Sequence, residues 1–344
     1  MLAQLDDLAS LTRIDTSGML DQMTSFPSQL TSSLRATGRR DIEADTVLVG
    51  GLGGSAMGGD VLAEYMGMNS SAPTFVVRDT ALPRWADERT LVVLISYSGN
   101  TRETLSMYGS AKDRGCPTVV ITSGGRIMEI AQQDGRDVVQ VPPGLQPRAA
   151  LGYLLGSAAG VVESAGLAPM ASDIRPFVPE LESLMRDLLP GSPESNNAAK
   201  QIARRLLDSV PFVYAPRPLR SAATRWQTQI NENSKMLCLS GEAPEMDHNQ
   251  IVGWIDGDRD PRNRPVMLLP RSGQCQATSL MRTTIELLME HGIDTVVADL
   301  EGGSPLESAL HGIMLGDFVS YYLAMLREVD PTPVTSINEL KSRR

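Results

Sequence analysis

Residues 91–104 of the chain read LVVLISYSGNTRET, and the predicted architecture is organised around this stretch. It begins with an apolar run, residues 91–95, whose length and β-branched content are typical of a strand buried on both faces. Hydroxyl side chains follow at Ser96, Ser98 and Thr101, just before a predicted helix start. Such a turn can close around a phosphate, because hydroxyls, free backbone N–H groups and the helix N-terminus all attract the anion. The alternative is an ordinary strand-to-helix turn that Ser and Thr cap.

Short apolar strands alternate with helices on both sides of this stretch. The strands predicted in the first half span residues 46–49, 74–77, 91–95, 118–121 and 138–141. This alternation predicts an α/β fold in which helices cover both faces of a parallel sheet, and such sheets bind ligands at the carboxyl ends of their strands. The second half repeats the alternation with weaker phosphate turns, and its predicted strands span residues 211–215, 265–269 and 295–299.

The chain divides into two predicted domains. Its 344 residues are enough for two domains, and 42% hydrophobic content supports a packed core. We expect a helical lead-in at 1–40, a first domain at 41–165, a linker at 166–197 and a second domain at 198–344. The linker is assigned from its Pro, Gly, Ser and Asn content around one amphipathic helix.

Composition narrows the class of protein. A formal charge of -10 argues against a nucleic-acid partner, which normally meets a basic face. Cys116, Cys238 and Cys275 are scattered without CxxC spacing, so neither a disulfide framework nor a zinc site is indicated. The N-terminus is acidic where a signal peptide is basic, and no apolar run approaches the ~20 residues of a membrane span. We expect a cytoplasmic protein without a membrane partner.

A glycine-rich loop, GGLGGSAMGG at residues 50–59, follows the first predicted strand. Its glycines let the backbone approach a ligand closely, and Ser55 adds a hydroxyl at the start of the next helix. Residues 51–56 also satisfy the relaxed dinucleotide pattern G-x-G-x-x-G/A, with Asp79 placed as a ribose-binding acid. The second polar turn, at 96–101, disfavours a nicotinamide-binding site, because a Rossmann domain needs no hydroxyl cluster after its third strand.

The two polar loops together resemble the phosphosugar-binding signature of sugar isomerase (SIS) domains. The resemblance implies a five-stranded parallel sheet sandwiched by helices and a site for a sugar phosphate. It does not decide catalysis, since such domains also occur in transcriptional regulators and in the isomerase half of amidotransferases. The predicted phosphate-binding residues are Gly53, Gly54, Ser55, Ser96, Ser98 and Thr101.

Three further residues are candidates for catalysis. Arg148 follows PPGLQP near the same strand ends, where it could stabilise an enolate-type oxyanion or pair with a surface acid. Glu232 lies in WQTQINENSK on a predicted helix, and His248 lies in EMDHNQIVGW in a predicted loop. Taken singly, a helix-surface carboxylate and a satisfied loop histidine are the better interpretations.

Their combined context resembles the bifunctional phosphoglucose/phosphomannose isomerase family. The resemblance runs from about Gly50 to Lys341 and rests on PPGLQPRAALG, NENSK, PEMDHNQIVGW, DFVSYYLAML, VDPTPV and INELK. It implies that Glu232 moves a proton between sugar carbons 1 and 2 and that Arg148 helps to stabilise the intermediate.

The resemblance also implies residues for ring opening and an assembly. His248 and Lys341 would assist ring opening, and either Thr332 or Thr335 matches a family threonine near that lysine. The family forms homodimers in which the matching histidine crosses the interface, and the polar loop at 242–250 is long enough to do so.

These residue types suit metal-free aldose–ketose isomerisation. A proton α to a carbonyl must be removed and returned one carbon away, which one carboxylate can do from one face. An arginine supplies charge to the enediolate without titrating, and a histidine shuttles the hydroxyl proton. The three histidines are too dispersed to suggest a metal cluster. We expect glucose 6-phosphate and mannose 6-phosphate to interconvert with fructose 6-phosphate without a cofactor; a non-catalytic phosphosugar-binding regulator and a nicotinamide-dependent oxidoreductase are the alternatives.

Overall fold

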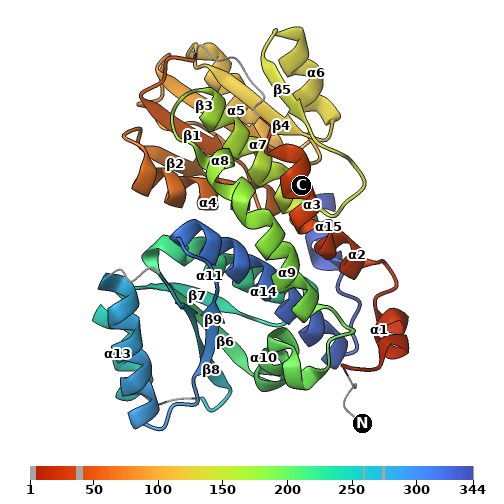
Figure 1. Ribbon diagram of the computed structural model, residues 1–344. Coiled ribbons are helices and arrows are strands. Elements are labelled where there is room, and N and C mark those ends of the chain that lie inside the picture. Colours follow the sequence, from red (N-terminus) through yellow and green to blue (C-terminus); the bar gives the residue numbers. More distant parts are fainter. Residues whose placement is uncertain (1–4, 36–41, 259, 273–275, 344) are drawn as a thin grey trace. The chain divides into compact units, whose positions relative to one another are not determined.

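The computed structural model describes residues 5–35, 42–258, 260–272 and 276–343. Their contacts divide the chain into two compact units. The first-sheet unit comprises residues 24–180, and the second-sheet unit comprises residues up to 23 together with residues from 181 onward. Each unit contains one parallel sheet with helices on its faces, which confirms the predicted α/β fold (Figure 1).

The first sheet is built from the five predicted strands. They are β1 (Thr46–Gly50), β2 (Thr74–Val77), β3 (Thr90–Ile95), β4 (Thr118–Thr122) and β5 (Asp137–Gln140). All pairs are parallel in the order β2-β1-β3-β4-β5, so β3 is central and every one of its residues is buried. Gly50 of β1 pairs with Leu94 of β3, which places the carboxyl ends of these two strands side by side.

Helices of the first-sheet unit pack closely on one another because glycines line their contacts. The unit's helices are α3 (Phe26–Ser33), α4 (Gly54–Asn69), α5 (Arg102–Asp113), α6 (Gly125–Gln133), η1 (Pro147–Ala150), α7 (Leu151–Ser164), α8 (Met170–Ile174) and η2 (Arg175–Phe177). A Cβ on Gly152 would lie 2.6 Å from Cβ of Gln29, and one on Gly58 would lie 3.3 Å from the backbone of Leu155. Helices α3 and α4 therefore approach α7 more closely than larger residues would permit.

The second sheet has four parallel strands in the order β7-β6-β8-β9. They are β6 (Val210–Pro216), β7 (Leu239–Ala243), β8 (Asn263–Pro270) and β9 (Val296–Leu300). Strand β7 was not predicted, because its sequence LSGEA contains no apolar run and it lies at an exposed edge. The predicted loop at 245–254 is also wrong, since it contains η5 (Glu245–His248) and α12 (Gln250–Ile255).

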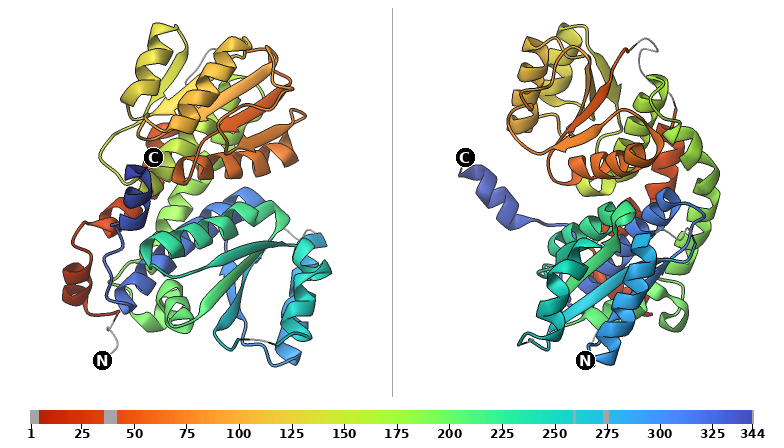
Figure 2. Two further views of the ribbon diagram at one scale, coloured as in Figure 1. Left: turned by 180° about the vertical axis from the view of Figure 1, so that it is seen from behind. Right: turned by 90° about the vertical axis from the view of Figure 1, so that its left-hand side faces the viewer.

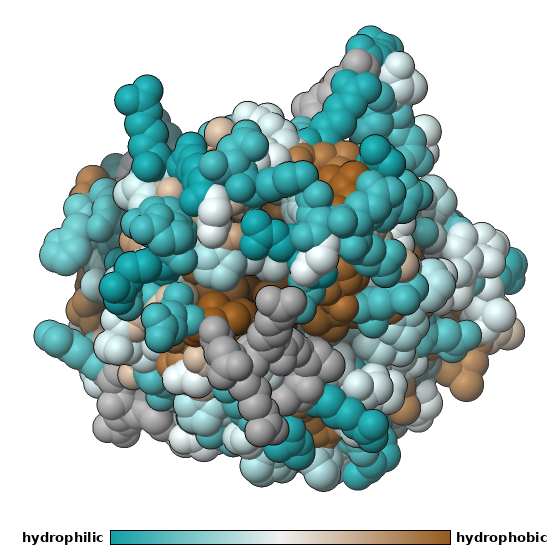
Figure 3. Space-filling view, turned by 90° about the horizontal axis from the view of Figure 1, so that it is seen from above, coloured by the Kyte–Doolittle hydropathy of each residue, from teal (hydrophilic) through white to brown (hydrophobic). Residues whose placement is uncertain are grey.

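Helix α14 (Pro305–Leu326) is the core helix of the second-sheet unit. Its N-terminus is a complete capping box formed by Ser304 and Glu307. Arg225 of α11 (Arg220–Asn233) makes a bidentate ion pair with Asp317 of α14, with both N···O distances 2.7 Å. Among the described residues, α14 is the one helix long and apolar enough to cross a membrane, and its apolar window is entirely buried within the protein. The face of the molecule in Figure 3 carries mostly hydrophilic side chains with hydrophobic patches between them.

The remaining helices of the second-sheet unit lie around these elements. They are α1 (Leu8–Ile14), α2 (Met19–Thr24), α9 (Val178–Leu188), η3 (Glu194–Asn196), α10 (Ala198–Leu206), η4 (Arg217–Leu219), α13 (Gln276–Glu290) and α15 (Thr335–Ser342). The boundary residues of α2 and α9 fall in the first-sheet unit. The predicted lead-in therefore supplies helices to both units, and the predicted linker contains four helical segments, α8, η2, α9 and η3.

Candidate functional site

The polar turn after β3 has the geometry of an anion-binding loop. Gly99 has φ +69°, and a Cβ there would overlap the carbonyl oxygen of Gly124, so only glycine fits. Thr101 is the N-cap residue of α5 with an extended backbone, yet its side chain makes no capping hydrogen bond. It accepts instead from Ser96 Oγ at 3.3 Å, and the side chain of Ser98 is exposed. The missing cap from Thr101 disfavours the ordinary capped turn, and Ser98 Oγ accepts only a long local bond from Asn100 N at 3.4 Å.

The glycine-rich loop after β1 lies against this turn. Gly53 has φ +54° and is the N-cap residue of α4, so the N-terminus of α4 also has no side-chain capping hydrogen bond. Ser55 Oγ accepts a hydrogen bond from the backbone N of Tyr97 at 3.2 Å, which ties the two loops together. A Cβ on Gly51 would lie 2.9 Å from the carbonyl oxygen of Ile95, so this close approach requires glycine.

A third loop, which the sequence reasoning missed, follows β4. Ser123 Oγ donates to the carbonyl oxygen of Tyr97 at 2.6 Å. Gly125 has φ +75°, and a Cβ there would overlap the carbonyl oxygen of Ser98. The backbone N of Arg126 donates to Asn100 Oδ1 at 3.0 Å. This loop therefore braces the turn after β3, and its sequence signal is a Ser-Gly-Gly triplet directly after an apolar strand.

Arg148 lies at the same edge of the first sheet. It belongs to η1 and is 3% exposed, so it is not the surface arginine of the alternative interpretation. A Cβ on Gly54 would lie 2.9 Å from Cα of Arg148, which shows that the two backbones are in contact. Gln29 Nε2 donates to the carbonyl oxygen of Ala149 at 2.8 Å and fixes η1 from the other side. The structure thus places Arg148 against Gly54, at the sheet edge that carries all six predicted phosphate-binding residues.

Glu232 is a half-buried residue near the end of α11. The following Asn233 is buried and donates from Nδ2 to Ser320 Oγ at 2.9 Å. Lys235 has φ +55°, and its Nζ donates to the carbonyl oxygens of Glu232 at 2.7 Å and Pro331 at 3.0 Å. Hydrogen bonds to Ser320 and to Pro331 therefore both fix the end of the helix that carries Glu232.

His248 is an exposed residue at the end of η5, beyond the carboxyl end of β7. Its neighbours anchor this segment, since Met246 is fully buried and Asp247 Oδ1 accepts from Thr284 Oγ1 at 2.6 Å. Glu232 lies near the amino end of β7, because the backbone N of Cys238, just before that strand, donates to Oδ1 of the adjacent Asn231 at 2.9 Å. Within one chain, Glu232 and His248 therefore lie beyond opposite ends of the five-residue strand β7.

Lys341 lies on α15, of which no residue is buried. Asp330 holds the preceding segment, because Oδ2 accepts from Thr16 Oγ1 at 2.6 Å. Helix α15 then extends away from the rest of the second-sheet unit at the C-terminus (Figure 2). Thr332 is buried and Thr335 is exposed at the start of α15.

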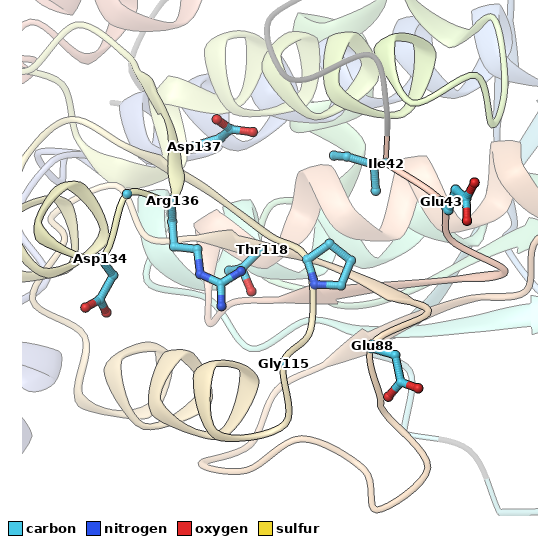
Figure 4. Close-up of a pocket in the computed structure, with 10 residues that line it drawn as sticks. Ile42, Glu43, Glu88, Gly115, Thr118, Asp134, Arg136 and Asp137 are labelled. Atoms are coloured by element: carbon cyan, nitrogen blue, oxygen red, sulfur yellow. The ribbon is translucent and has the colours of Figure 1, made fainter.

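Two described pockets lie away from the predicted site residues. One, of about 440 Å³, lies at the amino ends of β3, β4 and β5 in the first-sheet unit. Figure 4 shows the carboxyl groups of Glu43, Glu88, Asp134 and Asp137 around this pocket, with Arg136 as its basic residue. Such a charge balance repels a phosphate dianion. The other, of about 400 Å³ in the second-sheet unit, is lined by aromatic residues including Phe212, Tyr214 and Trp254.

Two cysteines and His311 take buried, structural positions in the described part of the chain. Cys116 and Cys238 are buried free thiols, and burial raises the pKa of Cys238 to about 12. Cys275 lies outside the described residues. His311 Nδ1 accepts from the backbone N of Glu301 at 2.8 Å, and burial lowers its pKa to about 4. Among the residues described, no group of three or more His, Cys, Asp or Glu side chains could hold a metal.

Comparison with known proteins agrees with this geometry. Residues 42–129 match the SIS domain family, and residues 195–343 match the bacterial phospho-glucose isomerase C-terminal SIS domain family. The tagatose-6-phosphate ketose/aldose isomerase from Escherichia coli has the same fold, with a TM-score of 0.71 at 14% identity, covering 93% of this chain and 96% of that chain.

Two similar relatives are both named bifunctional phosphoglucose/phosphomannose isomerase. The protein from Caldicellulosiruptor bescii is 38% identical over 315 residues, covering 88% of this chain and 90% of the relative. The protein from Aquifex aeolicus is 36% identical over 294 residues, covering 85% and 88%. On these similarities, the chain belongs to the bifunctional phosphoglucose/phosphomannose isomerase family.

Proposed function

We propose that the protein interconverts glucose 6-phosphate and mannose 6-phosphate with fructose 6-phosphate. Both aldoses give the same enediolate intermediate, since they differ only at the carbon that loses its proton. The observation that carries the proposal is the edge of the first sheet where three glycine-braced loops meet beside Arg148. The family membership of the chain makes an isomerase the expected chemistry of that edge.

The phosphate of the substrate is proposed to bind at the turn after β3. Ser98 is exposed at this turn, Thr101 has no capping bond, and the loop carrying Gly53 and Ser55 lies beside it. The N-terminus of α5 adds a favourable partial charge. A hydrogen bond from a hydroxyl to a charged phosphate is worth about 1.5–3 kcal/mol, so two such bonds supply about 3–6 kcal/mol. Millimolar affinity corresponds to about 4 kcal/mol and micromolar affinity to about 8 kcal/mol, so micromolar binding also needs the backbone donors.

The proton transfer is proposed to run through Glu232. Its carboxylate would take the proton from carbon 2 of an aldose, or from carbon 1 of fructose 6-phosphate, and return it to the other carbon. The Arg148 guanidinium would stabilise the negative charge that develops on the sugar oxygens. His248 and Lys341 would move the hydroxyl proton during ring opening. No step in this scheme needs a metal or a redox cofactor.

We further propose a cytoplasmic homodimer with a shared active site. One support is that Glu232 and His248 lie beyond opposite ends of β7 within a chain, so two subunits would bring one of each together at a shared site. A second support is the surface that leads to His248. Edge strand β7 and its surroundings expose Leu237 (67%), Leu239 (40%) and Val252 (55%), the kind of apolar area that a subunit interface covers.

A product assay tests the proposed function directly. The protein is incubated with fructose 6-phosphate, with and without a nicotinamide cofactor, and the sugars are then separated. We expect glucose 6-phosphate and mannose 6-phosphate in both arms, and we expect activity to survive a strong chelator. Products that appear only with the nicotinamide would indicate an oxidoreductase, and binding without any product would indicate a regulator.

A further inference from the structure

Tyr97 connects the loops at the carboxyl edge of the first sheet. It lies between two predicted phosphate ligands in the turn after β3 and is 5% exposed. Its backbone N donates to Ser55 Oγ at 3.2 Å, in the loop after β1. Its backbone carbonyl accepts from Ser123 N at 3.0 Å and from Ser123 Oγ at 2.6 Å, in the loop after β4. The main chain of Tyr97 thus holds the phosphate-binding turns together.

The side chain of Tyr97 reaches a different segment. Its hydroxyl donates to the carbonyl oxygen of Pro142 at 2.8 Å and accepts from the backbone N of Leu145 at 3.0 Å. These residues belong to the segment that follows β5 and leads into η1. Burial raises the pKa of the phenol, so the hydroxyl keeps its proton and donates this bond throughout the neutral range.

The segment held by the phenol ends at Arg148. Only two residues lie between Leu145 and Arg148, and Ala149 N closes the turn that contains Arg148 by donating to Gln146 O at 2.8 Å. Beyond the turn, Gln29 fixes Ala149. We propose that Tyr97 is a positioning residue that sets Arg148 against the phosphate-binding turns, a role that rests on the isomerase function proposed above. Its backbone organises phosphate binding, and its hydroxyl places the cation for the intermediate.

One substitution can separate the role of the Tyr97 backbone from the role of its hydroxyl. Tyr97→Phe keeps the ring in its buried space and keeps the backbone bonds to Ser55 and Ser123, so the phosphate turns stay in place. It removes the hydroxyl that holds Pro142 and Leu145. The segment can then relax, and a misplacement of about 1 Å at a catalytic group can cost on the order of 100-fold in rate.

Steady-state kinetics test the proposal with a matched control. For Tyr97→Phe we expect kcat to fall about tenfold or more while KM for the sugar phosphate stays within about twofold, because Arg148 acts on the developing charge rather than on the phosphate. Amide hydrogen exchange at Leu145 should become faster. The control is Tyr108→Phe, which deletes a 2.8 Å hydrogen bond from a buried tyrosine to Asp134 on the other edge of the same unit. It should leave kcat unchanged.

Three results would overturn the positioning role. These are a kcat of Tyr97→Phe within twofold of the wild type, an equal loss of kcat in Tyr108→Phe, and a raised KM with kcat retained. If the wild type does not isomerise sugar phosphates at all, the proposed function itself has failed. Tyr97 is then judged by binding of a phosphorylated aldonohydroxamate, an analogue of the enediolate. Weaker binding by about tenfold in Tyr97→Phe, with inorganic phosphate binding unchanged, supports the role, and unchanged binding of both overturns it.

Discussion

Two inactive variants should restore activity to each other if the active site is shared. The structure places Glu232 and His248 beyond opposite ends of strand β7, so the strand lies between them within one chain. Glu232→Gln removes the proposed base without changing its shape, and His248→Ala removes the proposed ring-opening group at an exposed position. Each homodimer should be nearly inactive.

The expected recovery follows from two-fold symmetry. When equal amounts of the variants are unfolded and refolded together, about half of the dimers are mixed. In each mixed dimer, one site carries both substitutions and the other carries neither, so recovered activity should approach about one quarter of the wild-type value. Varying the mixing fraction f should trace f(1 − f), with its maximum at equal amounts.

The assay is isomerisation of fructose 6-phosphate after refolding, with mixed dimers counted by native mass spectrometry on one mass-labelled variant. Refolding each variant alone is the control and should give no recovery. No activity at any mixing fraction, despite mixed dimers, would place His248 in the same site as the Glu232 of its own chain and would refute the shared site.

Other predictions address the phosphate turn and stability. Ser98→Ala and Thr101→Ala should each raise KM for the sugar phosphate about tenfold, since a hydrogen bond to a charged group is worth about 1.5–3 kcal/mol, whereas Ser110→Ala, at a half-buried position on α5, should leave KM unchanged. Gly99→Ala should lower the free energy of unfolding by more than about 1 kcal/mol in urea melts, because φ is +69° and a Cβ meets backbone; the control Gly109→Ala, with open space around it, should not destabilise. The folded pKa of His311 is lowered from 6.5 to about 4, so the unfolded chain binds more protons between these values. Its contribution, on the order of 3 kcal/mol, should be present above pH 6.5 and lost as pH falls toward 4, and His311→Asn should reduce that pH dependence in urea melts at pH 7 and pH 4.5.

The first sheet was predictable because each of its strands corresponds to a separate apolar run in the sequence. The residues at the strand ends could be placed for the same reason: parallel strands bring their carboxyl ends to one edge. Sequence alone left Arg148 open between an oxyanion role and a surface ion pair. Its burial and its contact with Gly54 depend on long-range packing, which no local pattern encodes.

The missed features share a physical cause. Strand β7 is half-exposed at a sheet edge, so its sequence needs no apolar run, and its pairing with β6 is fixed by tertiary context. The brace from Ser123 to Tyr97 joins residues far apart in the chain, although the Ser-Gly-Gly triplet marked the loop. The separation of Glu232 and His248 along β7 became visible only once that strand was known.

Whether Glu232 moves the proton between the sugar carbons can be measured by hydrogen exchange at the substrate. Fructose 6-phosphate is incubated in deuterium oxide with the wild type or with Glu232→Gln, and deuterium at carbons 1 and 2 is followed by NMR. We predict that the wild type incorporates deuterium during isomerisation. Glu232→Gln should lower the rate of isomerisation and the rate of deuterium incorporation by about 100-fold or more while still binding the sugar phosphate. Deuterium incorporation by Glu232→Gln at the wild-type rate would contradict the account, because another residue would then be the base.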